Sequence, residues 1–205
     1  MKYYSSFLFL LLSLFASAQK DTSQQIDSKG IESVYIDTDE AFKINMKTTK
    51  GDKILIATHT EGEYFNDIAL ITETQGKSLH LSTKFRKILQ SGYDKLSAHK
   101  VFSLEITIQI PEKLQVLIKS NIAALEAKGV YDFLEVELNS GYCTLTNFDG
   151  NALINTYNGS ISIETTNATV TASSRNGEVI IPPDFTGNHI IKATSINGNI
   201  RVVEN

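Results

Sequence analysis

The chain has 205 residues, of which 41% are hydrophobic, and its 23 acidic and 19 basic residues give a formal net charge of −4. This mildly acidic balance lacks the strongly basic face of a nucleic-acid-binding domain, so no nucleic-acid partner is expected. The single cysteine, Cys143, excludes an intrachain disulfide, and stability has to come from a packed core.

The first 18 residues have the features of a secretory signal peptide. Lys2 precedes an apolar run from Phe7 to Phe15, and Ala16 to Ala18 form a small-residue cleavage site. The run is shorter than the roughly 20 apolar residues that a membrane-spanning helix needs. We therefore expect cleavage after Ala18 and export to the periplasm or the cell exterior. No transmembrane segment is expected after cleavage, and no lipid anchor is expected because no cysteine stands at the end of the run.

Residues 19–111 predict an antiparallel β-rich leader region. Its segments alternate apolar and polar residues, as strands with one buried face do. These segments are ESVYIDT, AFKINMKTT, KILIATHT, IALITET, SLHLSTKF and VFSLEITIQIP. Short turn sequences between most of them favour antiparallel pairing. Pro111, which has no N–H to donate, fits the end of the last strand.

A repeat of 18 to 21 residues runs through residues 112–205. Its corners are placed at Asn121, Gly141, Gly159, Gly177 and Gly198. Five alternate columns, which lie seven, five and three residues before the corner and two and four after it, hold 22 apolar residues at 25 positions. The five columns between them hold about 8, so the pattern indicates an internal repeat with one face turned to a core.

Two geometries fit this repeat. Each repeat can be one coil of a short right-handed β-solenoid of about five rungs, in which equivalent residues stack about 4.8 Å apart. Alternatively, each Asn-Gly is the tight turn of a hairpin in an antiparallel meander, where Ile154 faces Ile163.

A second turn position in each repeat, eight to ten residues after the corner, favours the solenoid. The residues at this position are Gly129, Gly150, Ala168 and Gly187. If the coils stack in chain order, Ile161 lies between Cys143 and Val179. The leader then covers one open end, and the charged sequence RVVEN covers the other.

The strand and turn sequences ITIQIPEKLQVLIKS and LEVELNSGYCTLTNFDG, behind a signal peptide and a β-rich leader, resemble the DUF4097-type putative adhesin family. The resemblance is strongest over Val101 to Asn205. It implies a β-solenoid similar to the head domains of autotransporter adhesins and an exported bacterial protein. It supplies no functional residues.

Residues with catalytic or metal-binding chemistry do not form a recognisable site. Cys143 falls in an inward column, where a cysteine acts as a small hydrophobe. The four histidines, His59, His80, His99 and His189, lack the spacing of metal ligands.

The sequence also lacks the G-x-S-x-G motif of a serine nucleophile and a glycine-rich phosphate loop. Glu135 and Glu137 alternate on the outward face of one strand, which is the pattern of a solvated surface. We therefore expect no catalytic residue, no metal and no cofactor, and the chain is not expected to be an enzyme.

The long irregular stretch before Val101 is the candidate binding loop, because long loops often carry function. Its candidate residues are Lys84, Arg86, Lys87, Tyr93, Lys95, His99 and Lys100. An anionic envelope polymer could dock on this basic stretch.

Outward polar residues of the repeats form a second candidate surface for glycans, although hydration and side-chain ladders also explain them. They are Thr144, Asn155, Ser162, Ser173 and Thr194.

These features predict an exported, adhesin-like envelope or surface module that binds a glycan, polymer or protein partner without catalysis. An accessory role in envelope-stress or sigma/anti-sigma signalling is the first alternative. A small hydrolase or lyase that acts on polysaccharides is the second.

Overall fold

The structure is a computed structural model, which describes residues 19–62, 66–85, 102–183 and 185–205. All regular elements of this part are strands, so the prediction of an all-β chain is confirmed. The described residues contain no helix that is long and apolar enough to cross a membrane. The expected signal peptide, residues 1–18, lies outside the described residues.

The strands are β1 (Gln19–Asp27), β2 (Ser33–Asp37), β3 (Lys43–Thr49), β4 (Lys53–Gly62), β5 (Ile68–Gln75), β6 (Ser78–Phe85), β7 (Phe102–Pro111), β8 (Gln115–Ser120), β9 (Ala124–Ser140), β10 (Cys143–Asn158), β11 (Ile161–Thr165), β12 (Ala168–Ser174), β13 (Val179–Ile180), β14 (His189–Ser195) and β15 (Ile200–Glu204).

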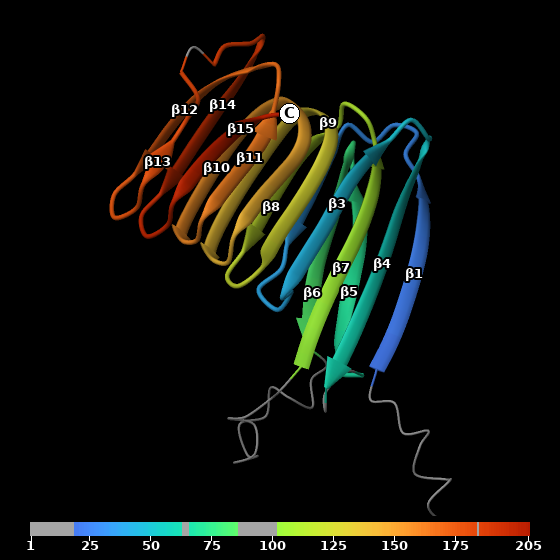
Figure 1. Cartoon of the computed structure of the whole chain (residues 1–205). Coiled ribbons are helices and arrows are strands. Elements are labelled where there is room, and N and C mark those ends of the chain that lie inside the picture. Colours follow the sequence, from blue (N-terminus) through green and yellow to red (C-terminus); the bar gives the residue numbers. More distant parts are fainter. Residues whose placement is uncertain (1–18, 63–65, 86–101, 184) are drawn as a thin grey trace, which may run out of the picture.

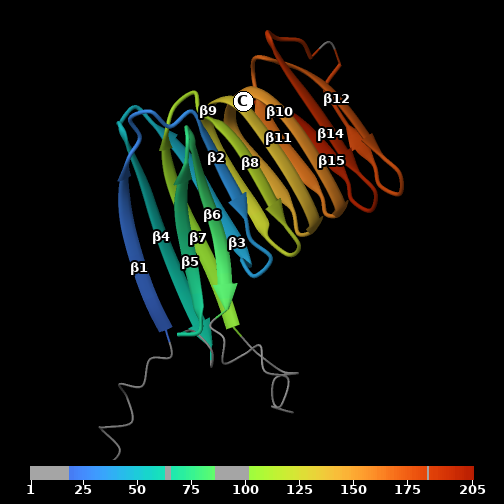
Figure 2. The ribbon, with the colours of Figure 1, turned by 180° about the vertical axis from the view of Figure 1, so that it is seen from behind.

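These strands form two faces with one hydrophobic core between them. The first face, at the front of Figure 1, has the order β1-β4-β7-β3-β9-β10-β11-β15-β13. The second face, at the front of Figure 2, has the order β5-β6-β2-β8-β9-β10-β14-β12. The long strands β9 and β10 contribute to both faces, because their first halves pair on the first face and their second halves on the second.

The repeats pair in parallel, and the antiparallel meander is therefore wrong. Ile154 lies between Val136 and Ala193, while Ile163 lies between Leu145 and Val202. Both isoleucines are fully buried, as the inward columns require. The chain thus returns to the same face in the same direction after each Asn-Gly corner and its opposite turn.

The leader is only partly antiparallel. Antiparallel pairs join β1 to β4, β4 to β7 and β5 to β6, as expected. In contrast, β2 pairs in parallel with β6 and β8, and β3 pairs in parallel with β7 and β9. The parallel stack therefore extends beyond the repeats, and the count of five rungs is not confirmed. Alternation in the sequence identifies which side of a strand is buried but not which strand lies next to it.

The last two repeats do not stack in chain order. On the first face β15 lies between β11 and β13, and on the second face β14 lies between β10 and β12. Ile161 consequently pairs with Cys143, as expected, but its other neighbour is Ile200 instead of Val179. The expected covering of the open end by the RVVEN sequence is also wrong, because β12 and β13 are outermost, at the left of Figure 1.

The corner glycines form a closely packed column in this spatial order. A Cβ atom on Gly159 would lie 1.7 Å from the carbonyl oxygen of Gly141, and one on Gly198 would lie 2.1 Å from that of Gly159. A Cβ atom on Gly177 would lie 2.2 Å from the carbonyl oxygen of Gly198. Glycine is required at these corners because the backbone of the neighbouring coil occupies the space of a side chain.

Three hydroxyl residues interrupt the apolar columns, and each has a specific partner at the corner. Thr156 and Ser195 donate to the carbonyl oxygen of Gly159 at 2.8 and 3.0 Å, and Ser174 donates to that of Gly198 at 2.7 Å. These bonds satisfy carbonyl groups of partly buried glycines at the corners. The polar exceptions in the repeat therefore have a structural role.

The corner asparagines form a ladder outside this column. The Asn197 amide donates to the Asn158 side chain at 2.7 Å, and the Asn176 amide donates to the Asn197 side chain at 2.6 Å. The ladder follows the same spatial order as the glycines and contains side chains from three coils.

Candidate functional site

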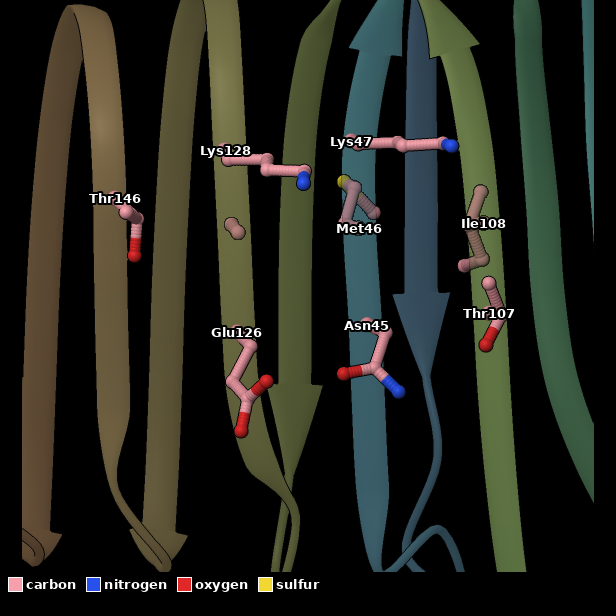
Figure 3. Close-up of a pocket in the computed structure, with 9 residues that line it drawn as sticks. Asn45, Met46, Lys47, Thr107, Ile108, Glu126, Lys128 and Thr146 are labelled. Atoms are coloured by element: carbon pink, nitrogen blue, oxygen red, sulfur yellow. The ribbon is translucent and has the colours of Figure 1, made fainter.

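A hollow of about 370 Å³ lies on the first face, across β7, β3, β9 and β10 (Figure 3). Its lining residues are Asn45, Met46, Lys47, Thr107, Ile108, Glu126, Ala127, Lys128 and Thr146. We call it the lysine hollow, because Lys47 and Lys128 are its two basic residues.

Parallel pairing brings the two lysines together. Lys47 of β3 lies opposite Lys128 of β9 in the register, and Thr146 of β10 lies on the other side of Lys128. Figure 3 shows both lysine side chains extended in the same direction across the sheet. One row along the strands, Asn45 lies between Glu126 and Thr107. The hollow therefore combines two ammonium groups with amide, hydroxyl and carboxylate groups.

An irregularity in the pairing of β9 and β10 fixes the backbone next to Lys128. Thr146 pairs with Lys128, but the next pair is Phe148 with Gly129, which leaves Asn147 as an extra residue with a φ of 45°. Gly129 has a φ of 109°, and a Cβ atom there would lie 2.0 Å from the Thr48 hydroxyl. The glycine thus allows the close approach of β3 and β9 that holds the two lysines side by side.

The carboxylate at the hollow is already paired. Lys43 contacts Glu126 at 2.9 Å, and the Tyr142 hydroxyl donates to the same carboxylate at 3.1 Å. The hydrogen bond from Lys43 lowers the pKa of Glu126 below its ordinary value, with a smaller contribution from Tyr142. The same contact raises the pKa of Lys43. Glu126 is therefore ionised and neutralised by Lys43.

Lys47 and Lys128 have no such partner, since no carboxylate of residues 19–62, 66–85, 102–183 or 185–205 forms an ion pair with either. Two adjacent like charges repel each other, and a bound anion would relieve this repulsion. Ammonium groups form strong hydrogen bonds to carboxylate and phosphate oxygens. The hollow is therefore suited to an anionic group.

The candidate loop cannot be compared with this site. Of its residues only Lys84 is described, exposed near the end of β6. The other candidate residues, Arg86, Lys87, Tyr93, Lys95, His99 and Lys100, lie outside the described residues, and the loop remains a prediction.

The histidines that are described form separate local contacts. His59 bonds to Glu61 at 2.9 Å and to Asp21 at 2.6 Å, which raises its pKa from 6.5 to about 9. His80 stacks on Tyr35 with ring centroids 4.8 Å apart. His189 contacts a buried oxygen of Asp149 at 3.0 Å. In the part of the chain that is described, no group of three or more potential ligands is arranged to hold a metal ion.

Cys143 is completely buried in the stack, between Leu125 and Ile161. Burial raises the pKa of its thiol to about 12, so the reactive thiolate is not populated near neutral pH. The prediction that it packs as a small hydrophobe is confirmed.

The outward polar residues of the repeats form two groups. Thr144 and Ser162 are neighbours on the first face. Asn155, Thr194 and Ser173 follow one another across three strands of the second face. Sequence reasoning missed the lysine hollow, because Lys47 and Lys128 occupy ordinary outward positions and only the pairing of β3 with β9 brings them together.

Comparisons with known proteins identify a shared fold. Neither a scan with protein-family models nor a search of curated proteins gave a match. Among solved structures, a "putative cell adhesion protein" from Clostridium sporogenes matches with a TM-score of 0.65 and 16% identity, over 91% of this chain and 100% of that chain. This similarity shows that the two chains have the same fold.

Two further solved structures are more distant. A "putative adhesin" from Bacteroides fragilis has a TM-score of 0.35 and 12% identity, over 90% of this chain and 97% of its own. A "putative lipid binding protein" from Parabacteroides distasonis has a TM-score of 0.28 and 12% identity, also over 90% and 97%. With such low TM-scores, these two carry no inference about this chain.

Proposed function

We propose that this chain is an exported, adhesin-like interaction module of the bacterial envelope, without catalytic activity, whose lysine hollow binds an anionic polymer. In this proposal residues 1–18 are the signal peptide, residues 19–111 form the leader and residues 112–205 form the repeat region. The parallel stack is a right-handed β-solenoid that presents the hollow on one flat face.

The pair of Lys47 and Lys128 carries the proposal. The two ammonium groups lie on adjacent strands without a carboxylate partner among the described residues, while Lys43 neutralises the nearby Glu126. Amide and hydroxyl groups of Asn45, Thr107 and Thr146 surround the pair and can bond to the hydroxyl groups of a sugar. An acidic polysaccharide offers both kinds of group on one molecule. The shared fold with a protein whose name refers to cell adhesion agrees with such a role.

The absence of catalysis is part of the proposal. Cys143 is buried with a raised pKa, and Glu137 forms an ion pair with Lys119 at 2.8 Å. These groups are accordingly engaged in packing and pairing, which leaves binding as the function that the hollow supports best.

The test is calorimetric titration of residues 19–205 with polygalacturonate and with polyphosphate, and dextran as the neutral control. Binding of at least one anionic polymer is expected, with an affinity that falls as salt is added. Replacing both lysines, Lys47→Ala with Lys128→Ala, should reduce the affinity at least about tenfold.

The control removes the same charge elsewhere. Lys29→Ala with Lys192→Ala changes two exposed lysines away from the hollow and should leave the affinity within about twofold. Failure of both anionic polymers to bind, or an equal loss in the control variant, would reject the proposal.

A further inference from the structure

A second and larger hollow, of about 530 Å³, lies on the second face at the Asn-Gly corners. It crosses β8, β9, β10 and β14, and we call it the corner groove. Its lining residues are Asp39, Lys119, Ser120, Asn121, Glu137, Leu138, Asn139, Asn155, Thr156, Tyr157, Thr194 and Ile196. It is formed by β8, β14 and the second halves of β9 and β10, which lie on the opposite side of the core from the lysine hollow (Figures 1 and 2).

The register arranges its outward side chains in two rows, each with one residue per strand. The first row is Lys119, Glu137, Asn155 and Thr194. The second row, two residues further along each strand, is Asn121, Asn139, Tyr157 and Ile196. At about 4.8 Å per strand, each row is roughly 14 Å long, so the groove offers an extended path across the strands.

The amide groups in the groove are free to bind a ligand. Asn121, Asn139 and Asn155 have no side-chain hydrogen bond to any residue that the structure describes, whereas the ladder asparagines such as Asn197 are bonded to each other. Each free amide offers two donors and an acceptor. Lys119 and Glu137 neutralise one another at 2.8 Å, so this ion pair gives the first row little net charge.

Tyr157 supplies an aromatic surface next to these amides. It is 50% exposed, and its backbone is fixed because its carbonyl oxygen accepts the Asn197 N–H at 2.8 Å. Its neighbours in the row are Asn139 and Ile196. A tyrosine ring is rigid, with an apolar body and a polar tip, and it gives contact area at a low entropic cost.

We infer that the corner groove binds a neutral oligosaccharide of pyranose rings. The C–H face of one ring packs on Tyr157, and the hydroxyl groups of successive rings bond to Asn121, Asn139, Asn155 and Thr194. The regular spacing of one polar group per strand suits a ligand that itself repeats. This site is separate from the lysine hollow, and neither requires the other.

The test is calorimetric titration with three neutral probes: cellohexaose, chitohexaose and maltohexaose. We expect the protein to bind at least one of them with little dependence on salt. Tyr157→Ala should weaken that binding at least about tenfold, and Asn139→Ala with Asn155→Ala should weaken it to a similar extent.

Two controls separate the sites. Tyr142→Ala removes a tyrosine of similar exposure, 43%, from the first face and should leave oligosaccharide binding unchanged. The lysine variant, Lys47→Ala with Lys128→Ala, should also bind the probe normally. Circular dichroism and a thermal unfolding curve for each variant show whether its fold is retained.

The inference is overturned if the wild-type protein binds none of the three probes at about 10 mM, a concentration that detects even weak sites. It is also overturned if a folded Tyr157→Ala variant binds as the wild type does. If the wild-type protein binds an oligosaccharide but neither anionic polymer, the proposed function is rejected and this inference stands.

Discussion

The corner glycine column predicts that Gly159→Ala destabilises the stack strongly. The Cβ atom of the alanine would lie 1.7 Å from the carbonyl oxygen of Gly141, whereas ordinary contacts begin near 3.4 Å. The two coils must therefore separate locally by about 1.7 Å, which is a third of the strand spacing of about 4.8 Å.

This displacement acts directly on the hydrogen bonds between the coils. The nearest are from Gly141 N to Asn158 O at 3.2 Å and from Cys143 N to Ser160 O at 3.0 Å. The N–H of the fully buried Cys143 would cost about 1 to 3 kcal/mol if it lost its partner, and the more exposed bond of Gly141 would cost less. We expect Gly159→Ala to lower the free energy of unfolding by about 2 to 4 kcal/mol. Backbone strain adds little, because Gly159 does not have a left-handed φ.

Equilibrium unfolding in urea, followed by far-ultraviolet circular dichroism, measures the effect. Gly51→Ala is the matched control, because that glycine also lacks a left-handed φ and its Cβ atom would meet nothing closer than 3.6 Å. The control should change the free energy of unfolding by less than about 0.5 kcal/mol. If the two variants were equally stable, the close packing of the corners would be wrong.

Three further variants test the register and an ion-paired histidine. Ile163→Asp, at a fully buried position, should lower the free energy of unfolding by several kcal/mol or unfold the chain. Ser162→Asp, at a partly buried position, should lower the free energy of unfolding in urea by less than about 1 kcal/mol. Equal effects would contradict the inward and outward assignment. Protonated His59 is held by Glu61 and Asp21, so its stabilising contribution is complete below the ordinary pKa of 6.5 and is lost as the pH rises through about 9. NMR titration of the His59 ring should show this raised pKa, and the stability difference between wild type and His59→Asn should vanish above it; a midpoint near 6.5 would show that the contacts do not hold the proton.

The buried side of most strands was predictable from the sequence, because alternation decides which residues face the core. The outermost strand β13 is an exception, since Val179 of the inward column is 37% exposed there. Leu145 and Ile163 are buried as the repeat requires. The order of the coils was not predictable in the same way. Val179 and Ile200 occupy the same column with nearly the same chemistry, so either one fits beside Ile161. In the structure it is Ile200 that pairs with Ile161, and Val179 pairs with Ile200 on the outer side.

The two hollows depend on which strands are neighbours and were harder to foresee. Lys47 and Lys128 are far apart in the sequence, and each is an ordinary outward residue of its own strand. The corner groove was partly foreseeable, since Asn155 and Thr194 are outward polar residues of the repeats and are neighbours in it. The neighbouring Tyr157 and Asn139 were missed because their relation to the groove comes from the register of β9 and β10.

The interior place of β14 and β15 has a consequence for how the molecule assembles. Residues 189–204 are synthesised after residues 168–180, yet they lie between them and the rest of the stack. Among the residues that the structure describes, β12 pairs only with β14, and β13 pairs only with β15. The outer strands β12 and β13 therefore cannot form their native pairs before residues 189–204 are available. Native docking of β12 and β13 requires β14 and β15 to be in place, although these two strands come later in the chain.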